Sequence, residues 1–266
     1  GEVGYNLKGI ATVTRQKYLT ASEKGPWANS YDRWRNDNLT NRYQGVQFGY
    51  TSAGRYTSWN DIWNYYGFKE RDVLPGDYKY EDWNGDGEIN GQDEHPFAFD
   101  QTPWLQFSLN AGLQWKNFDF NMLLQGSALG SMEYKEPLHE IWGKNGGGAL
   151  TQFLDRWHPV DPKADPYDPS TVWTSGHYAY TGRWAKNNSA FNRVSTAYLR
   201  LKSIELGYTF PKLKQIPNAS LRVYANAYNL LTFTGVKFVD PEHPDDDLGR
   251  MYPLNKTYTL GVSLSF

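Results

Sequence analysis

The chain has 266 residues, enough to bury a large core, with a net charge of −2 and no cysteine. The near-neutral charge provides no basic surface for nucleic acid, and the lack of cysteine excludes disulfide scaffolds and thiolate metal sites. Aromatic residues make up 17% of the sequence, an unusual share for a soluble domain, and no apolar run of about 18 residues predicts a membrane helix.

Alternation of apolar and polar residues at period two first occurs at residues 5–13 and is clearest at 105–128. Within the second segment, Leu, Phe, Met and Trp alternate with Gln, Ser and Asn on both sides of Lys116-Asn117. If these two residues form a turn, a single register pairs apolar with apolar and polar with polar side chains, and Leu109 faces Leu124. The segment therefore predicts a β-hairpin with one apolar and one polar face.

Further strands are predicted later in the chain, and the connections between the strands are very unequal in length. The strands fall at 203–210, 219–234 and 257–266. Short turns are expected at 116–117 and 211–218, and long loops at about 17–101, 131–197 and 235–251. About 9–11 tilted residues cross a bilayer, and short turns on one rim with long loops on the other are typical of outer-membrane barrels. We therefore expect an all-β chain of about six antiparallel transmembrane strands.

Aromatic residues near the expected strand ends support the same interpretation, since barrels carry aromatic girdles at both membrane interfaces. The residues expected in the two girdles are Trp115, Phe118, Phe210 and Phe266 at the short-turn rim, and Trp104, Tyr134, Tyr198 and Phe233 at the long-loop rim. Six strands cannot close a membrane barrel, whose smallest examples have about eight, so we expect other strands to complete the wall. The alternative is a soluble β-sandwich with one face in water.

Six segments, in order along the chain, resemble the SusC/RagA-type TonB-dependent transporters of Bacteroidota. They are PGDYKYEDWNGDGEIN (75–90), WKNFDFNMLLQGSALG (115–130), AYLRLKSIELGYTFP (197–211), RVYANAYNLLTFT (222–234), DPE (240–242) and YPLNKTYTLGVSLSF (252–266). Residues 1–74 match the family only loosely.

The resemblance implies that residues 1–266 form the C-terminal portion of a 22-stranded transmembrane barrel in the bacterial outer membrane. It also implies a plug, which this chain lacks, a SusD-like surface lipoprotein, and energy supplied by TonB through the missing N-terminal part. The expected function is import of nutrients, oligosaccharides or peptides, without enzymatic activity. The alternative is a soluble or surface β-sandwich protein that binds or cleaves carbohydrate. No GxSxG or HExxH motif occurs, and no acidic pair is singled out as catalytic.

The segment 82–93 matches an EF-type pattern of oxygen ligands, with glycine at the sixth position. The expected Ca²⁺ ligands are Asp82, Asn84, Asp86, Glu88, Asn90 and Asp93. Asp93 stands where the pattern usually has a bidentate glutamate, and no helices are expected on either side. The site would therefore be a structural clip, and the alternative is a metal-free turn rich in Asx and Gly.

Nine of the 11 tryptophans lie in the expected loops, where aromatic rings suit the faces of sugars but also pack loops together. The candidates for substrate contact are Trp142, Trp157, Trp173 and Trp184. His139, His158 and His177 are too evenly and widely spaced for a metal motif, so scattered surface positions are expected for them.

Overall fold

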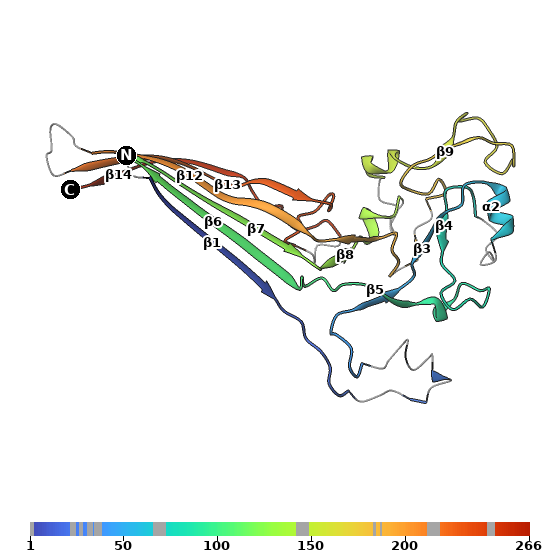
Figure 1. Cartoon of the computed structure of the whole chain (residues 1–266). Helices are drawn as coiled ribbons and strands as arrows, with labels where there is room; N and C mark the ends of the chain where they lie inside the picture. Colours follow the sequence, from blue (N-terminus) through green and yellow to red (C-terminus); the bar gives the residue numbers. More distant parts are fainter. Residues whose placement is uncertain are drawn as a thin grey trace.

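The protein is described here by a computed structural model. It describes residues 3–21, 25–26, 29–30, 34, 39–65, 73–141, 149–182, 185–186, 188–211, 219–243 and 248–266. One end of the molecule is a long β-sheet, and the other end is formed by the connecting loops (Figure 1). Among the described residues, no helix has the length and apolar character needed to cross a membrane.

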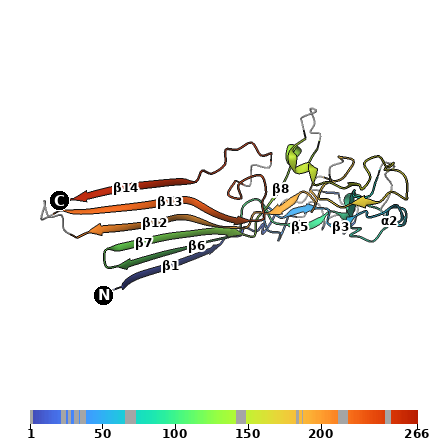
Figure 2. The same ribbon diagram turned by 90° about the horizontal axis from the view of Figure 1, so that it is seen from above.

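Six long antiparallel strands form the sheet, in the order β1-β6-β7-β12-β13-β14. Their bounds are β1 Val3–Val13, β6 Leu105–Trp115, β7 Phe118–Ala128, β12 Tyr198–Phe210, β13 Ser220–Thr234 and β14 Thr257–Ser265. Figure 2 shows the strands side by side in one layer. The hairpin of β6 and β7 has the predicted register, with Leu109 opposite Leu124 and Trp115 opposite Phe118.

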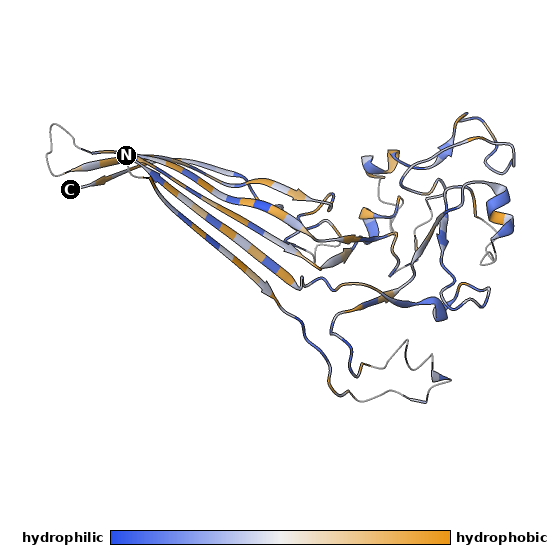
Figure 3. Ribbon diagram, in the orientation of Figure 1, coloured by the Kyte–Doolittle hydropathy of each residue, from blue (hydrophilic) through white to orange (hydrophobic). Residues whose placement is uncertain are grey.

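Hydrophobic and hydrophilic residues alternate along the strands (Figure 3). One face of the sheet is apolar across all six strands, because the register keeps apolar residues in line from strand to strand. One such row consists of Leu7, Ala111, Met122, Ile204, Ala227 and Tyr258. The neighbouring row on the other face consists of Lys8, Asn110, Leu123, Ser203, Tyr228 and Thr257. The two sets of side chains are called the apolar face and the polar face below.

The apolar face is uncovered. Leu7 is 69% exposed, Leu206 54% and Leu260 85%, and among the described residues no second sheet packs on this face. A β-sandwich would bury these side chains between two sheets. The sandwich alternative is therefore wrong, and the sheet has the two-faced character of a barrel wall.

A bulge in the middle of the sheet reverses the alternation towards the long loops. Lys202 in β12, together with residues 229–230 in β13, has no partner in the ladder, and Asn229 has a φ of 53°. Because one extra residue moves every later side chain to the other face, Leu199 and Leu201 join the apolar face beyond the bulge, while Tyr198 joins the polar face. The prediction that Tyr198 belongs to an interfacial girdle is therefore wrong.

The rim with the short turn does carry packed aromatic residues. Trp115 stacks on Phe118 with ring centroids 6.2 Å apart, Phe118 meets Tyr208 at 4.7 Å, and Tyr208 meets Phe210 at 4.8 Å. These residues lie on the apolar face at the ends of β6, β7 and β12. The expected turn at 211–218 lies almost wholly outside the described residues.

The loops fold into small units of their own. Short strands pair two by two: β2 Gln47–Gly49 with β5 His95–Ala98, β3 Ser52–Arg55 with β4 Tyr78–Tyr80, β8 Ser131–Glu133 with β11 Arg193–Ser195, and β9 His158–Pro159 with β10 Trp173–Thr174. The helix α2 spans Trp59–Asn64, and 3-10 turns span Gly91–Asp93, Glu136–Leu138 and Thr151–Leu154. Two small clusters, one around Ile62 and one around Phe153, form the apolar interior of this region.

Candidate functional site

The polar face carries two groups of ion pairs, one near each end of the strands. Near the short-turn rim, Arg222 of β13 reaches across to Asp119 of β7 and donates to Glu205 of β12 at 2.6 Å. Asn226, four residues further along β13, donates to the same glutamate at 3.4 Å. Charged side chains on this face therefore pair with one another along the wall.

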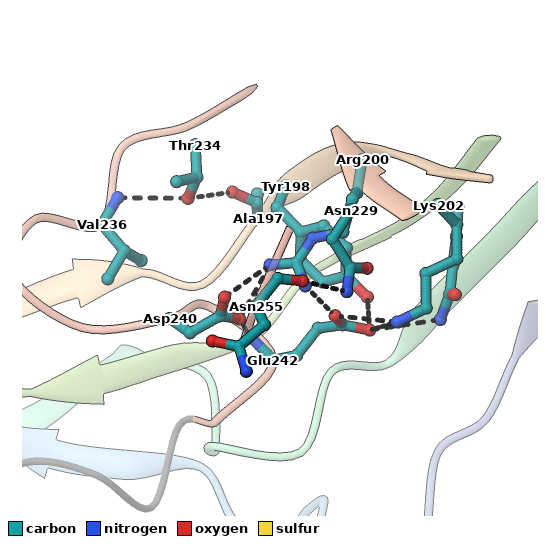
Figure 4. Close-up of polar contacts among 11 residues, drawn as sticks. Ala197, Tyr198, Arg200, Lys202, Asn229, Thr234, Val236, Asp240, Glu242 and Asn255 are labelled. Atoms are coloured by element: carbon teal, nitrogen blue, oxygen red, sulfur yellow. Dashed lines mark hydrogen bonds and ion pairs between the residues drawn. The ribbon is translucent and has the colours of Figure 1, made fainter. Parts of the chain in front are cut away.

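The second group lies at the long-loop end of β12 and is centred on Arg200 (Figure 4). This side chain is only 1% exposed, and its guanidinium holds both oxygens of Asp240 at 2.7 and 2.8 Å. It also pairs with Glu242. Nη2 alone makes both contacts with Asp240, and Nη1 is directed to Glu242, so one guanidinium is shared between the two carboxylates.

Glu242 collects further donors from the same face. Tyr198 Oη donates to it at 3.0 Å, Lys202 Nζ at 3.2 Å and Gln125 Nε2 at 3.4 Å. Two cationic and two anionic side chains thus form a neutral cluster, which offsets much of the cost of removing these charges from water. The cluster attaches the loop after β13 to the polar face of the sheet.

A cavity of about 650 Å³ adjoins this cluster on the polar face. Its lining includes uncharged polar side chains from β1, β6 and β7, carboxylates from two loops, and no lysine or arginine. The polar and acidic lining residues are Thr12, Asp100, Gln101, Thr102, Gln106, Ser108, Gln125, Ser127, Tyr198 and Glu242. Leu123, which breaks the polar alternation of β7 in the sequence, lies in the same lining. The arrangement offers hydrogen-bond donors and acceptors to an uncharged polar ligand.

The segment 82–93 closes into a loop through its own backbone amides. Asp82 accepts from the amides of Gly85, Asp86 and Gly87 at 2.7–3.2 Å. Desolvation raises the pKa of Asp82, but these hydrogen bonds to the carboxylate outweigh it, and the pKa is lowered. Gly85 and Gly87 have φ of 74° and 81°, the left-handed conformation that glycine adopts without strain.

Asp93, the expected last ligand, also accepts backbone amides of the loop. Its carboxylate accepts from the amides of Trp83 and Asn90 at 2.9 and 2.8 Å, and its side chain is fully buried. Burial raises the pKa of Asp93. Among the described residues, no three His, Asp or Glu side chains come together as a metal-binding group. Asn84 Nδ2 donates to Asp86 Oδ2 at 2.8 Å, while Asn84 Oδ1 and Asp86 Oδ1 accept the amides of Asp86 and Glu88 at 2.9 and 2.8 Å.

Two of the four tryptophan candidates, Trp142 and Trp184, lie outside the described residues. Trp157 packs on Gly76, whose missing Cβ would stand 2.3 Å from its Cγ. Trp173 lies in β10, with its ring 5.4 Å from that of Tyr180. The two described candidates thus contact other loop residues.

The three histidines behave differently from one another. His158 is exposed, but His139 is 7% exposed, and burial lowers its pKa to about 4 against the smaller opposing effect of the Lys135 backbone. The expectation that all three lie scattered on the surface is therefore wrong for His139. Leu138 before it is apolar and Glu140 after it is charged, so the adjacent residues did not indicate that the His139 side chain is buried.

The residues that sequence reasoning missed are Arg200, Asp240 and Glu242. Arg200 lies about 40 residues before Asp240 and Glu242 in the chain, within β12 on the loop side of the bulge at Lys202. A signal was available, since both LRLKS and DPE occur in the segments that carry the family resemblance, but nothing there indicated that they meet.

Comparison with known proteins gives the same picture. The chain is 28% identical over 211 residues to TonB-dependent receptor P3 of Formosa agariphila, which covers 73% of the chain and 19% of the receptor. It is 27% identical to receptor P26 of the same organism over 84% of the chain and 22% of that receptor, and 26% identical to SusC of Bacteroides thetaiotaomicron over 78% and 19%. The chain thus spans about a fifth of the length of these curated relatives.

Solved structures with a similar fold include the RagAB peptide importer in its closed-closed state, with a TM-score of 0.58, 19% identity, and coverage of 98% of this chain and 27% of that one. The RagAB peptide transporter aligns with a TM-score of 0.51 and 22% identity over 83% and 22%. No family model matches the sequence.

The fold and its two unlike faces define a wall segment of a large antiparallel β-barrel. More particularly, the chain is homologous over most of its length to SusC-like TonB-dependent receptors, and its fold is that of part of a SusC/RagA-type barrel.

Proposed function

We propose that this chain forms the last six strands of an outer-membrane, TonB-dependent importer of oligosaccharides or peptides. The apolar face lies against lipid, the polar face lines the interior, and the long loops face the outside of the cell. In this proposal a plug, a SusD-like surface lipoprotein and TonB act on the same receptor through parts beyond residues 1–266.

The observation that carries this proposal is the single register that keeps apolar residues on one face across all six strands. Two strand edges, on β1 and β14, have no ladder partner among the described residues. Lipid cannot satisfy backbone groups at such edges, so further strands must pair with them, and a closed barrel of about 22 strands in all is our proposal for the whole. The relatives with printed functions are receptors and a peptide importer, not enzymes.

The orientation of the wall can be tested with adjacent residues at one depth. The chain has no cysteine, so Leu109→Cys and Asn110→Cys in a whole receptor free of other cysteines each give a single site for a nitroxide label. The label at 109 should be accessible to oxygen in the bilayer, and the label at 110 to a water-soluble nickel complex. The same accessibility at both positions would contradict the assignment of the two faces.

The nutrient class is tested by deleting the gene and measuring growth on oligosaccharide mixtures and on peptides as the only carbon source. Loss of growth on one class assigns it, and unchanged growth and uptake on both contradicts an import function. Solubilising the receptor in mild detergent and identifying co-purifying lipoproteins by mass spectrometry tests the proposed lid.

We also propose that the 82–93 loop binds Ca²⁺ as a structural clip, through Asp82, Asn84 and Asp86, with the Glu88 backbone carbonyl and Asn90 beside them. Support comes from the ligand spacing in the sequence and from the two left-handed glycines that curve the loop around these side chains. Asp93 is proposed as the last ligand, and like Asp82 it also accepts backbone amides that close the loop.

Terbium is a suitable probe, because Trp83 lies within the loop and can sensitise its luminescence. The whole receptor should show luminescence that Ca²⁺ displaces and that Asp86→Asn weakens, since the amide retains the hydrogen-bonding shape but removes one charge. Asp168→Asn, which changes an exposed turn aspartate elsewhere, is the matched control. Equal luminescence in the unmodified receptor and both variants, or no luminescence in any of them, would contradict the Ca²⁺ site and favour the metal-free turn.

A further inference from the structure

The described part of the loop after β13, residues 235–243, makes two contacts of different chemistry. At its base, Val236 is buried, its amide donates to Thr234 Oγ1 at 3.1 Å, and the amide of Lys237 donates to Tyr134 Oη at 2.8 Å. At its tip, Asp240 and Glu242 pair with Arg200 on the polar face (Figure 4). The base is therefore held by an apolar contact and backbone hydrogen bonds, and the tip by charges.

The tip is a rigid unit in itself. Asp240 Oδ1 accepts the amide of Glu242 at 2.9 Å, and its carbonyl accepts the amide of His243 at 3.0 Å. Pro241 between the two acids has a fixed φ. Both carboxylates are thus presented together by one tight turn, and they bind or leave the Arg200 guanidinium as a pair.

The wall side of this contact is fixed. Arg200 is 1% exposed and lies in the middle of the sheet, between β7 and β13. Asp240 and Glu242 are 15% and 17% exposed, so the water excluded from the arginine is excluded mainly by the turn. Pro241, the apolar residue of the turn, is buried as Val236 is, so release of the turn exposes one proline ring and the two carboxylates to water.

We propose that the turn at 240–242 is a latch, with Arg200 as its fixed half, that holds the 235–243 loop against the inner wall and can release it. Pro241 and Glu242 form one side of the 650 Å³ cavity, and Tyr198 and Gln125, which bind Glu242, line the cavity beside them. Release removes that side and opens the cavity towards the loop end of the barrel. The meaning of release for import rests on the proposed function, but the latch itself does not.

The latch is tested in the whole receptor, made free of other cysteines, with His243→Cys as a reporter next to the turn. The rate of reaction with a water-soluble maleimide measures how often the turn leaves the wall. Arg200→Gln, and separately the pair Asp240→Asn with Glu242→Gln, should raise this rate about tenfold or more, because each removes the ion pairs between Arg200 and the turn, and the double variant leaves Arg200 buried without a carboxylate.

Arg222→Gln is the matched control, since it removes an arginine with two carboxylate partners from the same face at the opposite rim. It should leave the labelling rate unchanged. An equal rise in the control would mean general loosening of the barrel and would overturn the latch, and so would an unchanged rate in Arg200→Gln. If that variant does not assemble, Arg200→Lys and the single change Glu242→Gln provide the same comparison with a smaller loss of contacts.

The two proposals fail separately, because labelling is measured on detergent-solubilised receptor and does not require transport. A receptor with the expected labelling pattern and no uptake of any nutrient would retain the latch and reject the import function. A receptor that imports normally, and whose variants all react with the maleimide at the same rate, would retain the import function and reject the latch.

Discussion

Replacing Leu109 by arginine tests the membrane assignment most directly. Leu109 lies on the apolar face, with Gly9 on one neighbouring strand and Leu124 on the other. It is four residues from the loop end of β6, about 13 Å along the strand at about 3.3 Å per residue. An arginine side chain there is too short to carry its charge to either interface. We therefore expect a loss of about 2–4 kcal/mol in the free energy of unfolding, the cost typical of a charge near the bilayer midplane.

Asn110→Arg is the control, since it adds the same side chain at nearly the same depth but on the polar face. It should cost less than about 1 kcal/mol, as is usual for surface changes. Leu124→Arg, opposite Leu109, should repeat the larger loss. The measurement is urea unfolding of the whole receptor in phospholipid vesicles, followed by tryptophan fluorescence. Equal losses at all three positions would refute the assignment of the apolar face to lipid.

Three further perturbations address the bulge and the loops. Deleting Lys202 removes the extra residue of β12 but leaves Ser203 opposite Leu123, Leu201 opposite Leu124 and Arg200 on the polar face, so we expect the receptor to assemble, read as heat-modifiable receptor in the membrane; loss of assembly would contradict the placing of the extra residue at Lys202. Gly76→Ala should loosen the loops by more than Gly54→Ala in hydrogen exchange, because both positions have positive φ but only at Gly76 does an added Cβ meet Trp157; equal effects would leave backbone strain alone as the cause. His139 has a pKa of about 4 in the folded protein, below that of an unfolded chain, so the folded state binds fewer protons and its stabilisation, at most about 3 kcal/mol, is present above pH 6.5 and lost as the pH falls towards 4. Hydrogen exchange around 131–141 should show this loss, and His139→Gln should abolish the pH dependence.

The strands were predictable because their information is local. In 105–128 each residue's face follows from its position relative to one turn, and one register satisfies both faces, so no distant contact was needed to place Leu109 opposite Leu124. The same reasoning explains why the apolar face of β14 could be read directly from residues 257–266. The family resemblance then extended these local assignments to the whole wall.

The loop at 82–93 shows the limit of a spacing argument. The spacing correctly indicated a tight turn with glycine at the sharp positions, but it does not say which carboxylate accepts which backbone amide. In the fold Asp82 accepts the amides of Gly85, Asp86 and Gly87, and Asp93 accepts those of Trp83 and Asn90. These bonds depend on how the whole loop closes, which the spacing of the acidic residues does not specify.

What the sequence by itself determined is the alternation along each strand, the β6–β7 register and the division into short turns and long loops, since these depend on neighbours a few residues apart. Only the tertiary structure decided the phase beyond Lys202, where a bulge places Tyr198 and Arg200 on the polar face. It also decided the meeting of Arg200 with Asp240 and Glu242, about 40 residues away. The physical reason is that a bulge and a folded-back loop depend on pairing between separate strands, and the sequence of one strand does not contain that pairing.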